Sequence, residues 1–423
     1  MLQTGQLLAA ERAYPVEELV KRLLNQFSDL WWDSQTSLPT LGPAFAPGVQ
    51  AAKEKQFNRL VDGLIFELKN LAPDAPQAAR EALQTRLRGH ALGFAQDALR
   101  LQEHQLHFLE TSGLFEALQT FARMARRFDP SISGADIYQA GRNVMTANFL
   151  QLLMGLPVEV TPAVFAYSML YPYTDNYLDD PTIARETKHS FNQRFRHRLQ
   201  GESILPANRH ETVISELVTM IESQYERQRY PLVWDSLLAI HAAQARSLRL
   251  VALGASPYEL NVLGVTFEKG GTSVLADGYL VAGDLSPEAA AFCFGYGCFT
   301  QLMDDLEDVE NDRKEGQMTI FTQTIPHWRL DAITNRMIHF GRNLTHLMSA
   351  FDSPASQPLR ELIEGSLDPV LIDMVGQAGA YYTRDYLHAL ESHLPFRFAA
   401  IKKQRGKLKR HQLPLSRLVE TLL

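Results

Sequence analysis

The chain has few cysteines, no long hydrophobic run and no excess of basic residues, and each absence excludes a class of protein. Cys293 and Cys298 are the only cysteines among 423 residues, too few to staple a chain of this length, so we expect a protein of the reducing cytoplasm. The formal net charge of −7 argues against a dedicated nucleic-acid binder, which is normally basic. The most apolar stretch, residues 149–173, is interrupted by Glu159 and three prolines, so no transmembrane segment is expected.

Strand signals are also scarce, whereas the start signals of helices are frequent. Thr161-Pro162, Ser256-Pro257 and Ser286-Pro287 each offer a capping hydroxyl followed by a proline suited to the first helical position. A long segment with helical apolar periodicity follows each of them. We therefore predict an all-α protein, and we find no internal repeat that would indicate a solenoid.

The composition divides the chain into three regions. Residues 1–128 are expected to form an N-terminal helical region, which ends where Asp129-Pro130 stops a helix. Residues 129–401 show no composition break and are interpreted as one helical bundle. Residues 402–423 begin with the basic run KKQRGKLKRH, interpreted as a solvated tail or as a contact site for a partner or an anionic membrane surface.

The segment DNYLDD places three carboxylates at the end of a predicted helix. A helix capped by Thr161 should end near Pro181, because the residue before a proline disfavours the helical conformation. Asp175 and Asp179 are four residues apart and share a face, with Asp180 beside them. Carboxylates at a helix C-terminus oppose the helix dipole and repel one another. A divalent cation would neutralise them.

A second acidic segment, QLMDDLEDVENDRKEG, closes a helix that we expect to run from Ser286-Pro287 to Gly316. Its carboxylates are spaced by four residues, with one flanking residue: Asp304, Asp308 and Asp312, flanked by Asp305. Arg313 and Lys314 follow directly and could meet phosphate oxygens.

Two interpretations of these acidic segments are open. Each could be a solvated helix face, but the helices that precede them are too apolar to be exposed, so the acids lie where buried helices reach an opening. Neither segment has the oxygen alternation of a calcium loop, and oxygen-only ligands favour Mg²⁺ or Mn²⁺ over zinc. Since Mg²⁺ binds through one or two carboxylates plus substrate phosphates, two such sets suggest a clamp on a di- or triphosphate.

Lys269, Gly270 and Gly271 lie inside a helix predicted to run from Pro257 to Ala282. Paired glycines inside a helix cost about 1 kcal/mol each relative to alanine. They either permit a break where the backbone approaches a ligand, with Lys269 as a phosphate contact, or they permit two helices to cross closely.

The stretch KGGTS…FTQLMDDLED resembles the class I isoprenoid synthases, which include trans-prenyl diphosphate synthases, squalene and phytoene synthases and class I terpene synthases. The matching positions are Lys269, Gln301, Asp304, Asp305 and Asp308. DNYLDDPTI resembles the first acidic motif of these enzymes, except that Asn176 replaces its second aspartate. The resemblance covers residues 135–325.

The resemblance implies an antiparallel α-bundle over residues 129–401 whose acidic helices face each other at the mouth of an apolar cavity. Three Mg²⁺ ions, or Mn²⁺, would bind the diphosphate of an allylic substrate and generate a carbocation. The implied metal ligands are Asp175, Asp179, Asp180, Asp304, Asp305, Asp308 and Asp312, of which Asp175, Asp179, Asp304 and Asp308 are the catalytic set. The implied diphosphate contacts are Lys269, Arg313, Lys314, Arg185 and Arg142. The aromatic residues Phe165, Tyr167, Tyr171 and Tyr173 either face the cation or pack in the core.

The reaction is expected to be terpene cyclisation. Chain-elongating members hold a second diphosphate with a lysine and arginines, whereas here Arg142, Met145, Ala184 and Arg185 stand at the corresponding places. Chain elongation, head-to-head condensation of the squalene type, a non-catalytic partner subunit and a helical scaffold without catalysis are the alternatives. A homodimer is also left open.

Overall fold

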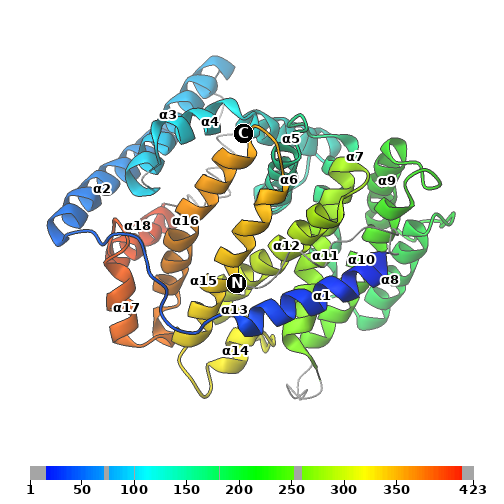
Figure 1. The fold of residues 1–423 in the computed structure, drawn as a ribbon. Coiled ribbons are helices and arrows are strands. Elements are labelled where there is room, and N and C mark those ends of the chain that lie inside the picture. Colours follow the sequence, from blue (N-terminus) through cyan, green and yellow to red (C-terminus); the bar gives the residue numbers. More distant parts are fainter. Residues whose placement is uncertain (1–15, 71–75, 100, 181, 252–259, 412–423) are drawn as a thin grey trace.

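The computed structural model describes residues 16–70, 76–99, 101–180, 182–251 and 260–411, without the side chains of residues 77, 80, 91, 97–99 and 179. Every regular element in these ranges is helical, and no β-strand occurs among them, as predicted (Figure 1). The α-helices are α1 Val16–Asp33, α2 Pro47–Asn70, α3 Gln77–Leu99, α4 Glu103–Thr111, α5 Leu114–Phe128, α6 Gly134–Leu153, α7 Pro162–Asp179, α8 Arg185–Leu199, α9 Arg209–Gln224, α10 Pro231–Ser247, α11 Val262–Ala282, α12 Pro287–Glu307, α13 Val309–Glu315, α14 Ile320–Thr324, α15 Asp331–Thr345, α16 Ser356–Gln377, α17 Arg384–Glu391 and α18 Phe398–Arg410. The 3₁₀ helices are η1 Leu248–Val251, η2 His346–Ala350 and η3 Gly379–Tyr381.

Side-chain caps set the starts of the three helices that carry the predicted motifs. Thr161 and Ser286 each accept a hydrogen bond from the backbone amide three residues further on, and a proline follows both. These two predicted starts are confirmed. The predicted start at Ser256-Pro257 lies outside the described residues, and α11 begins at Val262 behind an Asn261 cap.

The prediction of one continuous helix from Pro287 to Gly316 is wrong in one respect, because the helix is interrupted at Asp308. This residue has φ −91° and ψ 5°, and it ends α12 and starts α13. Aspartate is a weak former of helix interiors because its side chain competes for nearby backbone groups. The final stop is as predicted, since Gly316 adopts the left-handed conformation with φ 75°.

The paired glycines of α11 mark a close helix crossing. Helix α11 is unbroken, so the alternative of a break at Gly270 and Gly271 is wrong. A Cβ atom on Gly270 would lie 2.3 Å from the carbonyl oxygen of Gly297 in α12, and one on Gly297 would lie 2.1 Å from the carbonyl oxygen of Gly270. Glycine is therefore needed on both sides of this contact.

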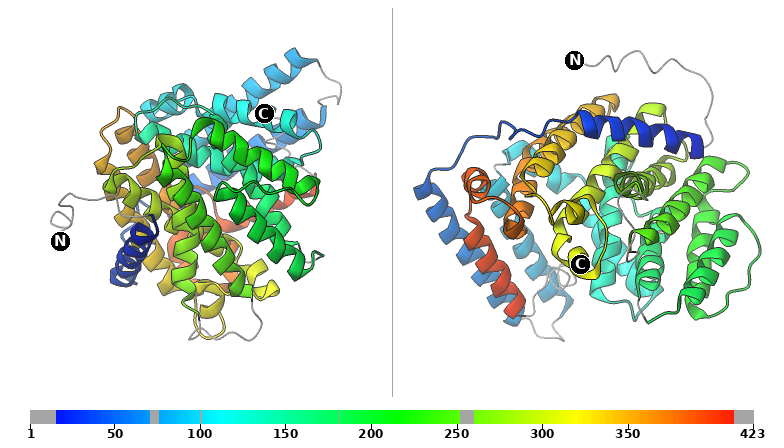
Figure 2. Two further views of the ribbon diagram at one scale, coloured as in Figure 1. Left: turned by 90° about the vertical axis from the view of Figure 1, so that its right-hand side faces the viewer. Right: turned by 90° about the horizontal axis from the view of Figure 1, so that it is seen from below.

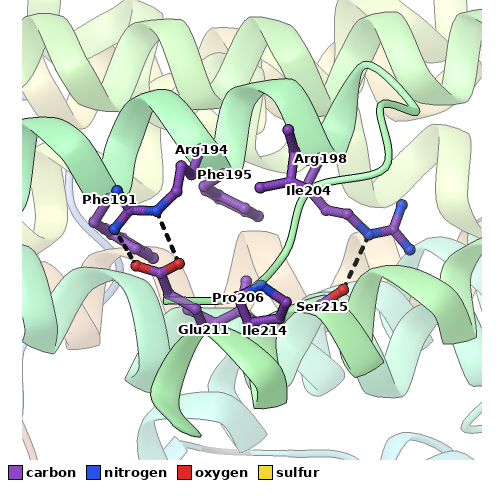
Figure 3. Close-up of a pocket in the computed structure, with 9 residues that line it drawn as sticks. All are labelled: Phe191, Arg194, Phe195, Arg198, Ile204, Pro206, Glu211, Ile214 and Ser215. Carbon is purple, nitrogen blue, oxygen red and sulfur yellow. Dashed lines mark hydrogen bonds and ion pairs between the residues drawn. The ribbon is translucent and has the colours of Figure 1, made fainter. Parts of the chain in front are cut away.

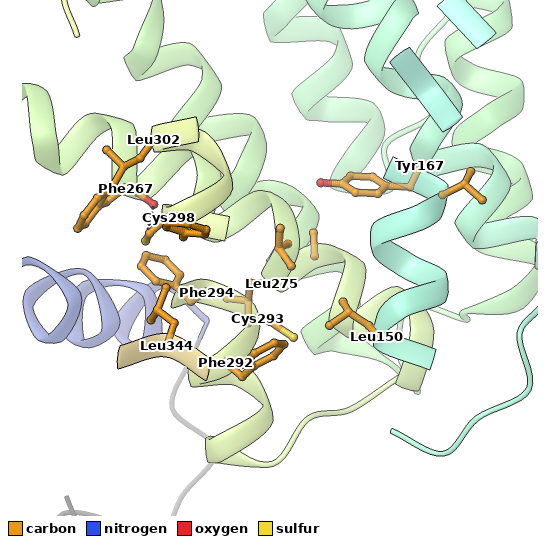
Figure 4. Packing of buried hydrophobic residues seen from close by; sticks show 14 of the residues in the cluster. Leu150, Tyr167, Phe267, Leu275, Phe292, Cys293, Phe294, Cys298, Leu302 and Leu344 are labelled. Carbon is orange, nitrogen blue, oxygen red and sulfur yellow. Dashed lines mark hydrogen bonds between the residues drawn. The ribbon is translucent and has the colours of Figure 1, made fainter. Parts of the chain in front are cut away.

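The α11–α12 pair forms the centre of the core. Phe267 of α11 and Phe294 and Cys298 of α12 are fully buried where the two helices meet (Figure 4). Helix α1 lies across this pair and closes the core with Trp31, whose ring packs edge-on against Phe267 at 6.2 Å (Figure 1). Helices α6, α7 and α10 contact the other faces of α11.

The basic run near the C-terminus is helical as far as Arg410 and packs through one face, whereas most of its basic side chains remain exposed. Helix α18 lies against α2, as Figure 2 shows with the red and blue helices side by side. Arg397, just before α18, pairs with Glu54 of α2 at 2.6 Å, and Arg405 pairs with Asp373 of α16 at 2.6 Å. Within the run itself, Arg405 and Lys407 pair with acidic residues that are remote in sequence, which the sequence alone could not reveal. Residues 412–423 lie outside the described residues.

Within the described ranges, no helix is both long enough and apolar enough to cross a bilayer.

Candidate functional site

A cavity of about 740 Å³ lies between α6, α7, α10, α11 and α12, with further lining residues from α5, α8 and α16. This volume falls within the range of ligand-binding pockets in proteins. Its wall is mainly apolar, and the five main helices contribute Met145, Phe149, Leu170, Leu237, Ile240, Val274 and Tyr296. One end carries the charged residues, and there the side chains of Arg142 and Asp304 are 57% and 39% exposed, so this end opens to solvent.

The charged end joins both predicted acidic segments. Asp175 comes from the last turns of α7, and Asp304 and Asp308 come from the end of α12. Two predicted cations line the same cavity, Arg142 from α6 and Lys269 from α11. Five of the predicted site residues are thus brought together on four different helices.

Asp175 is held in place by its neighbours. It accepts a hydrogen bond from the side-chain amide of Gln244 on α10 and one from the hydroxyl of Thr174 at 3.1 Å. Gln244 also lines the cavity and was not predicted from the sequence. Nothing in its local sequence relates it to α7, so only the packing of α10 against the cavity identifies it.

Asp304 forms an ion pair across the cavity opening. The guanidinium of Arg142 donates to its carboxylate at 2.5 Å, and this partner raises the pKa of Arg142. Partial desolvation and the nearby charge of Asp304 raise the pKa of Asp308. Glu307, which the sequence analysis did not single out, has a raised pKa for the same two reasons. This end of the cavity therefore holds more negative charge than its cations neutralise.

Asp305 and Asp312 form a separate group beside Lys269. Asp305 is buried and accepts hydrogen bonds from Gln301 at 3.0 Å and from Thr266 at 3.4 Å. Burial raises the pKa of Asp305 to about 7, and desolvation together with the charge of Asp308 raises that of Asp312 to about 7. Lys269 opposes both shifts. Neither carboxylate lines the cavity as described.

The remaining predicted acids of the first segment are not gathered at the cavity. The carboxylate of Asp180 accepts from the hydroxyl and the backbone amide of Thr182 at 2.6 and 2.8 Å, which closes the turn after α7. These bonds lower the pKa of Asp180. The side chain of Asp179 lies outside the described residues.

Three predicted phosphate contacts also lie away from the cavity lining. Arg313 donates to the hydroxyl of Tyr381 at 3.1 Å, and Lys314 pairs with Glu310 at 3.1 Å on the exposed face of α13. Arg185 is exposed at the first position of α8. Of the predicted cations, Arg142 and Lys269 are therefore the two that face the cavity.

Of the four aromatic residues considered as contacts for the carbocation, two line the cavity and two do not. Tyr167 and Tyr171 line the cavity, and Figure 4 shows Tyr167 reaching from α7 towards α11. Phe165 is buried in the core, and Tyr173 donates to the carboxylate of Asp129 at 2.5 Å.

Within the described residues, no three His, Cys, Asp or Glu side chains are grouped closely enough to hold a metal ion by themselves. The carboxylates at the cavity end therefore offer oxygen ligands from two helices without a complete protein cage.

A second pocket, between α8 and α9, is a structural feature. Its volume is about 20 Å³, room for about one water molecule. Figure 3 shows Arg194 of α8 bonded to Glu211 of α9, and Arg198 bonded to Ser215. These contacts join the two helices.

No protein-family model matches this chain, and no curated protein matches it significantly.

Proposed function

We propose that this chain is a Mg²⁺-dependent class I isoprenoid synthase that ionises an allylic prenyl diphosphate and releases diphosphate as a terpene synthase. One observation carries the proposal. Carboxylates of two separate acidic helix ends, together with Arg142 and Lys269, occupy the open end of a single, mainly apolar cavity. A ligand with an anionic head and a hydrocarbon tail matches that division of charge.

The carboxylates fit a magnesium ion that is shared with a substrate. Mg²⁺ keeps few protein ligands and completes its shell with phosphate oxygens and water, so a complete protein cage is not required. Asp175 on one side and Asp304 with Asp308 on the other would hold it. Desolvation and, after it, the charge of Asp304 raise the pKa of Asp308, and a cation bound there would stabilise its ionised form. When bound, the metal supplies positive charge that stabilises the departing diphosphate.

The other cavity residues have separate tasks. Arg142 and Lys269 line the cavity and would bind phosphate oxygens by charge-assisted hydrogen bonds. The apolar wall binds the hydrocarbon chain and limits the access of water to a reactive carbocation. Tyr167, Tyr171 and Tyr296 line the cavity, and aromatic rings can attract a cation there.

Met145 favours cyclisation over chain elongation. It lines the apolar cavity at the place where the resemblance leads us to expect an arginine for a second diphosphate. A thioether offers no such contact, and each missing charge-assisted contact weakens binding by about 1.5–3 kcal/mol.

The test supplies geranyl, farnesyl, geranylgeranyl and longer prenyl diphosphates one at a time with Mg²⁺. We expect hydrocarbons or terpene alcohols from one of them without isopentenyl diphosphate. A longer linear diphosphate formed only with isopentenyl diphosphate would establish chain elongation instead. A linear dimeric hydrocarbon would establish head-to-head condensation, and no turnover of any substrate would support a non-catalytic protein.

A further inference from the structure

Helices α2 and α18 run side by side at one edge of the molecule (Figure 2). The side chain of Asn58 on α2 bonds to that of Gln404 on α18, and Asp62 on α2 pairs with Lys407 on α18. Both contacts advance by about one turn in the same direction along their helices, so the helices are parallel. The outward faces on the two sides of the Asp62–Lys407 pair therefore adjoin.

Both outward faces are basic. Residues three or four positions apart share one face of a helix, and such spacing forms one stripe on each helix. These residues define the basic surface: Lys55, Arg59, Phe66 and Lys69 of α2, and Lys403, Lys407 and Arg410 of α18. All of them are exposed except Lys407, which is half-buried. Desolvation and then the charge of Lys69 lower the pKa of His411, with smaller contributions from two cations of α18. Cations of both helices therefore meet beside this histidine.

Acidic residues of the two helices do not neutralise this surface. Helix α18 contains no acidic residue. Helix α2 contains three, and each has an ion-pair partner: Glu54 with Arg397, Asp62 with Lys407 and Glu67 with Arg86. The other five cations of the basic surface have no ion-pair partner among the described residues. A protein with a formal net charge of −7 thus concentrates positive charge on one face.

An exposed aromatic ring lies among these cations. The side chain of Phe66 is 69% exposed, and it follows Arg59 and precedes Lys69 on the same stripe of α2. Helices that lie in a membrane interface combine basic residues with an aromatic residue that enters the acyl chains. An anionic bilayer therefore matches both the cations and the ring. An acidic protein would match the cations alone, and the net charge of the chain disfavours nucleic acid.

We propose that the basic surface of α2 and α18 docks on an anionic lipid bilayer. Both helix axes would lie in the plane of the membrane, with the cations at the lipid headgroups and Phe66 among the upper acyl chains. This surface lies outside the cavity, and the inference does not depend on the proposed function. Attraction between basic residues and anionic lipids falls off within a Debye length, so the binding should weaken as salt is added.

The test measures sedimentation of the full-length protein with sucrose-loaded vesicles, without Mg²⁺ or substrate. One set of vesicles contains phosphatidylcholine alone, and the other contains phosphatidylcholine with phosphatidylserine. We expect the protein to sediment with the anionic vesicles at about 0.1 M NaCl and to be released at about 0.5 M, where the Debye length is shorter. The neutral vesicles should leave it in the supernatant.

Variants of the basic surface should weaken this binding. Lys403→Gln combined with Arg410→Gln should lower the partition coefficient by about 30-fold, the combined effect of two basic residues near an anionic surface. Phe66→Ala should lower it by about tenfold through the loss of apolar burial. All three side chains are exposed, so circular dichroism should show an unchanged fold.

A matched control is Arg123→Gln combined with Arg127→Gln, which removes two exposed cations from α5 and changes the net charge equally. Its binding should equal that of the wild type. Absence of binding to the anionic vesicles, equal binding to both kinds of vesicle, or an equal loss in this control would overturn the inference. The proposed function is tested by turnover in solution, so it can fail while the vesicle binding stands, and the reverse.

Discussion

Arg142 of α6 donates a hydrogen bond to the carboxylate of Asp304 on α12 at 2.5 Å, across the opening of the cavity. The two residues are 162 positions apart in the chain. In the structure, this guanidinium neutralises one of the carboxylates proposed to bind metal. A metal ion that binds Asp304 has to compete with Arg142, and release of Arg142 makes its guanidinium available for phosphate oxygens.

Arg142→Gln should therefore have opposite effects on two ligands. Mg²⁺ alone should bind more tightly because its competitor is gone, whereas Mg²⁺ with pyrophosphate should bind more weakly by about 1.5–3 kcal/mol, the value of a charge-assisted hydrogen bond. Isothermal titration calorimetry measures both affinities. Arg185→Gln, at an exposed position away from the cavity lining, is the matched control and should change neither. Weaker binding of Mg²⁺ alone by Arg142→Gln would contradict the competition.

Pyrophosphate and Mg²⁺ together should raise the melting temperature of the wild-type protein more than either ligand alone. A ligand that binds only the folded state stabilises it by mass action, and here each component completes the site of the other. Differential scanning fluorimetry over a concentration series measures the effect. If the pair gives no shift beyond that of Mg²⁺ alone, the metal and diphosphate site is wrong.

Asp304→Ala and Asp175→Ala should abolish turnover and leave the fold intact. Both side chains lie at the open end of the cavity, and the ion pair of Asp304 with Arg142 is solvent-exposed, so its loss should cost at most about 1 kcal/mol of stability. Product formation and circular dichroism test the two halves of this prediction. Glu216→Ala removes an exposed carboxylate of α9 and should retain wild-type activity. Near wild-type activity in a folded Asp304→Ala protein would refute the assignment.

Gly297→Ala should destabilise the protein by about 3 kcal/mol, at the upper end of the usual cost of overpacking. The new methyl group would lie 2.1 Å from the carbonyl oxygen of Gly270, so the central helix pair would have to separate. Gly63→Ala on α2 is the matched control, because its Cβ position meets no atom within 4 Å. That change should stabilise the protein by about 1 kcal/mol through helix propensity. Urea denaturation measures both, and equal effects would contradict the close crossing.

Asp305 should make stability fall as pH rises from about 4 to 7. Its pKa is raised from 3.8 to about 7 in the folded protein, so the folded state keeps a proton that the unfolded chain has released. Since the folded state binds more protons in this window, the free energy of unfolding decreases with pH and the loss is complete above about pH 7. Asp305→Asn should therefore be more stable than the wild type at pH 8, by on the order of 1–4 kcal/mol, and equal to it at pH 4. Urea denaturation without Mg²⁺ at the two pH values is the measurement, and an equal difference at both would contradict the shift.

Local rules predicted those features that neighbouring residues determine. The caps at Thr161 and Ser286 and the stop at Gly316 follow from short-range hydrogen bonds and backbone conformation, and each was predicted correctly. The close helix crossing at Gly270 was one of two alternatives. A glycine pair in the sequence indicates that something approaches the backbone closely, but it does not identify whether a ligand or a second helix does so. The partner, Gly297, could be named only once both helices were placed.

Prediction of the candidate site from the sequence was limited in the same way, because it also depends on how the helices pack. Spacing placed Asp304, Asp308 and Asp312 on one helix face, but the helix is interrupted at Asp308, and Asp312 does not line the cavity with the other two. Gln244 has no motif around it and becomes visible only through the packing of α10. Side chains that act across helices depend on tertiary packing, which the periodicity of a single segment does not encode.

Helix α2, the second helix of the described chain, packs against its last helix, α18. Arg397 bonds to Glu54, and Gln404 bonds to Asn58, pairs that are 343 and 346 residues apart. During synthesis, α2 leaves the ribosome long before its partner exists. Its contact face, including the buried Val61 and Ile65, must wait for almost the whole chain to be translated. The packing of α18 against α2 is thus a late step of folding. Ribosome-bound chains that end before Phe398 should therefore expose α2 to proteases.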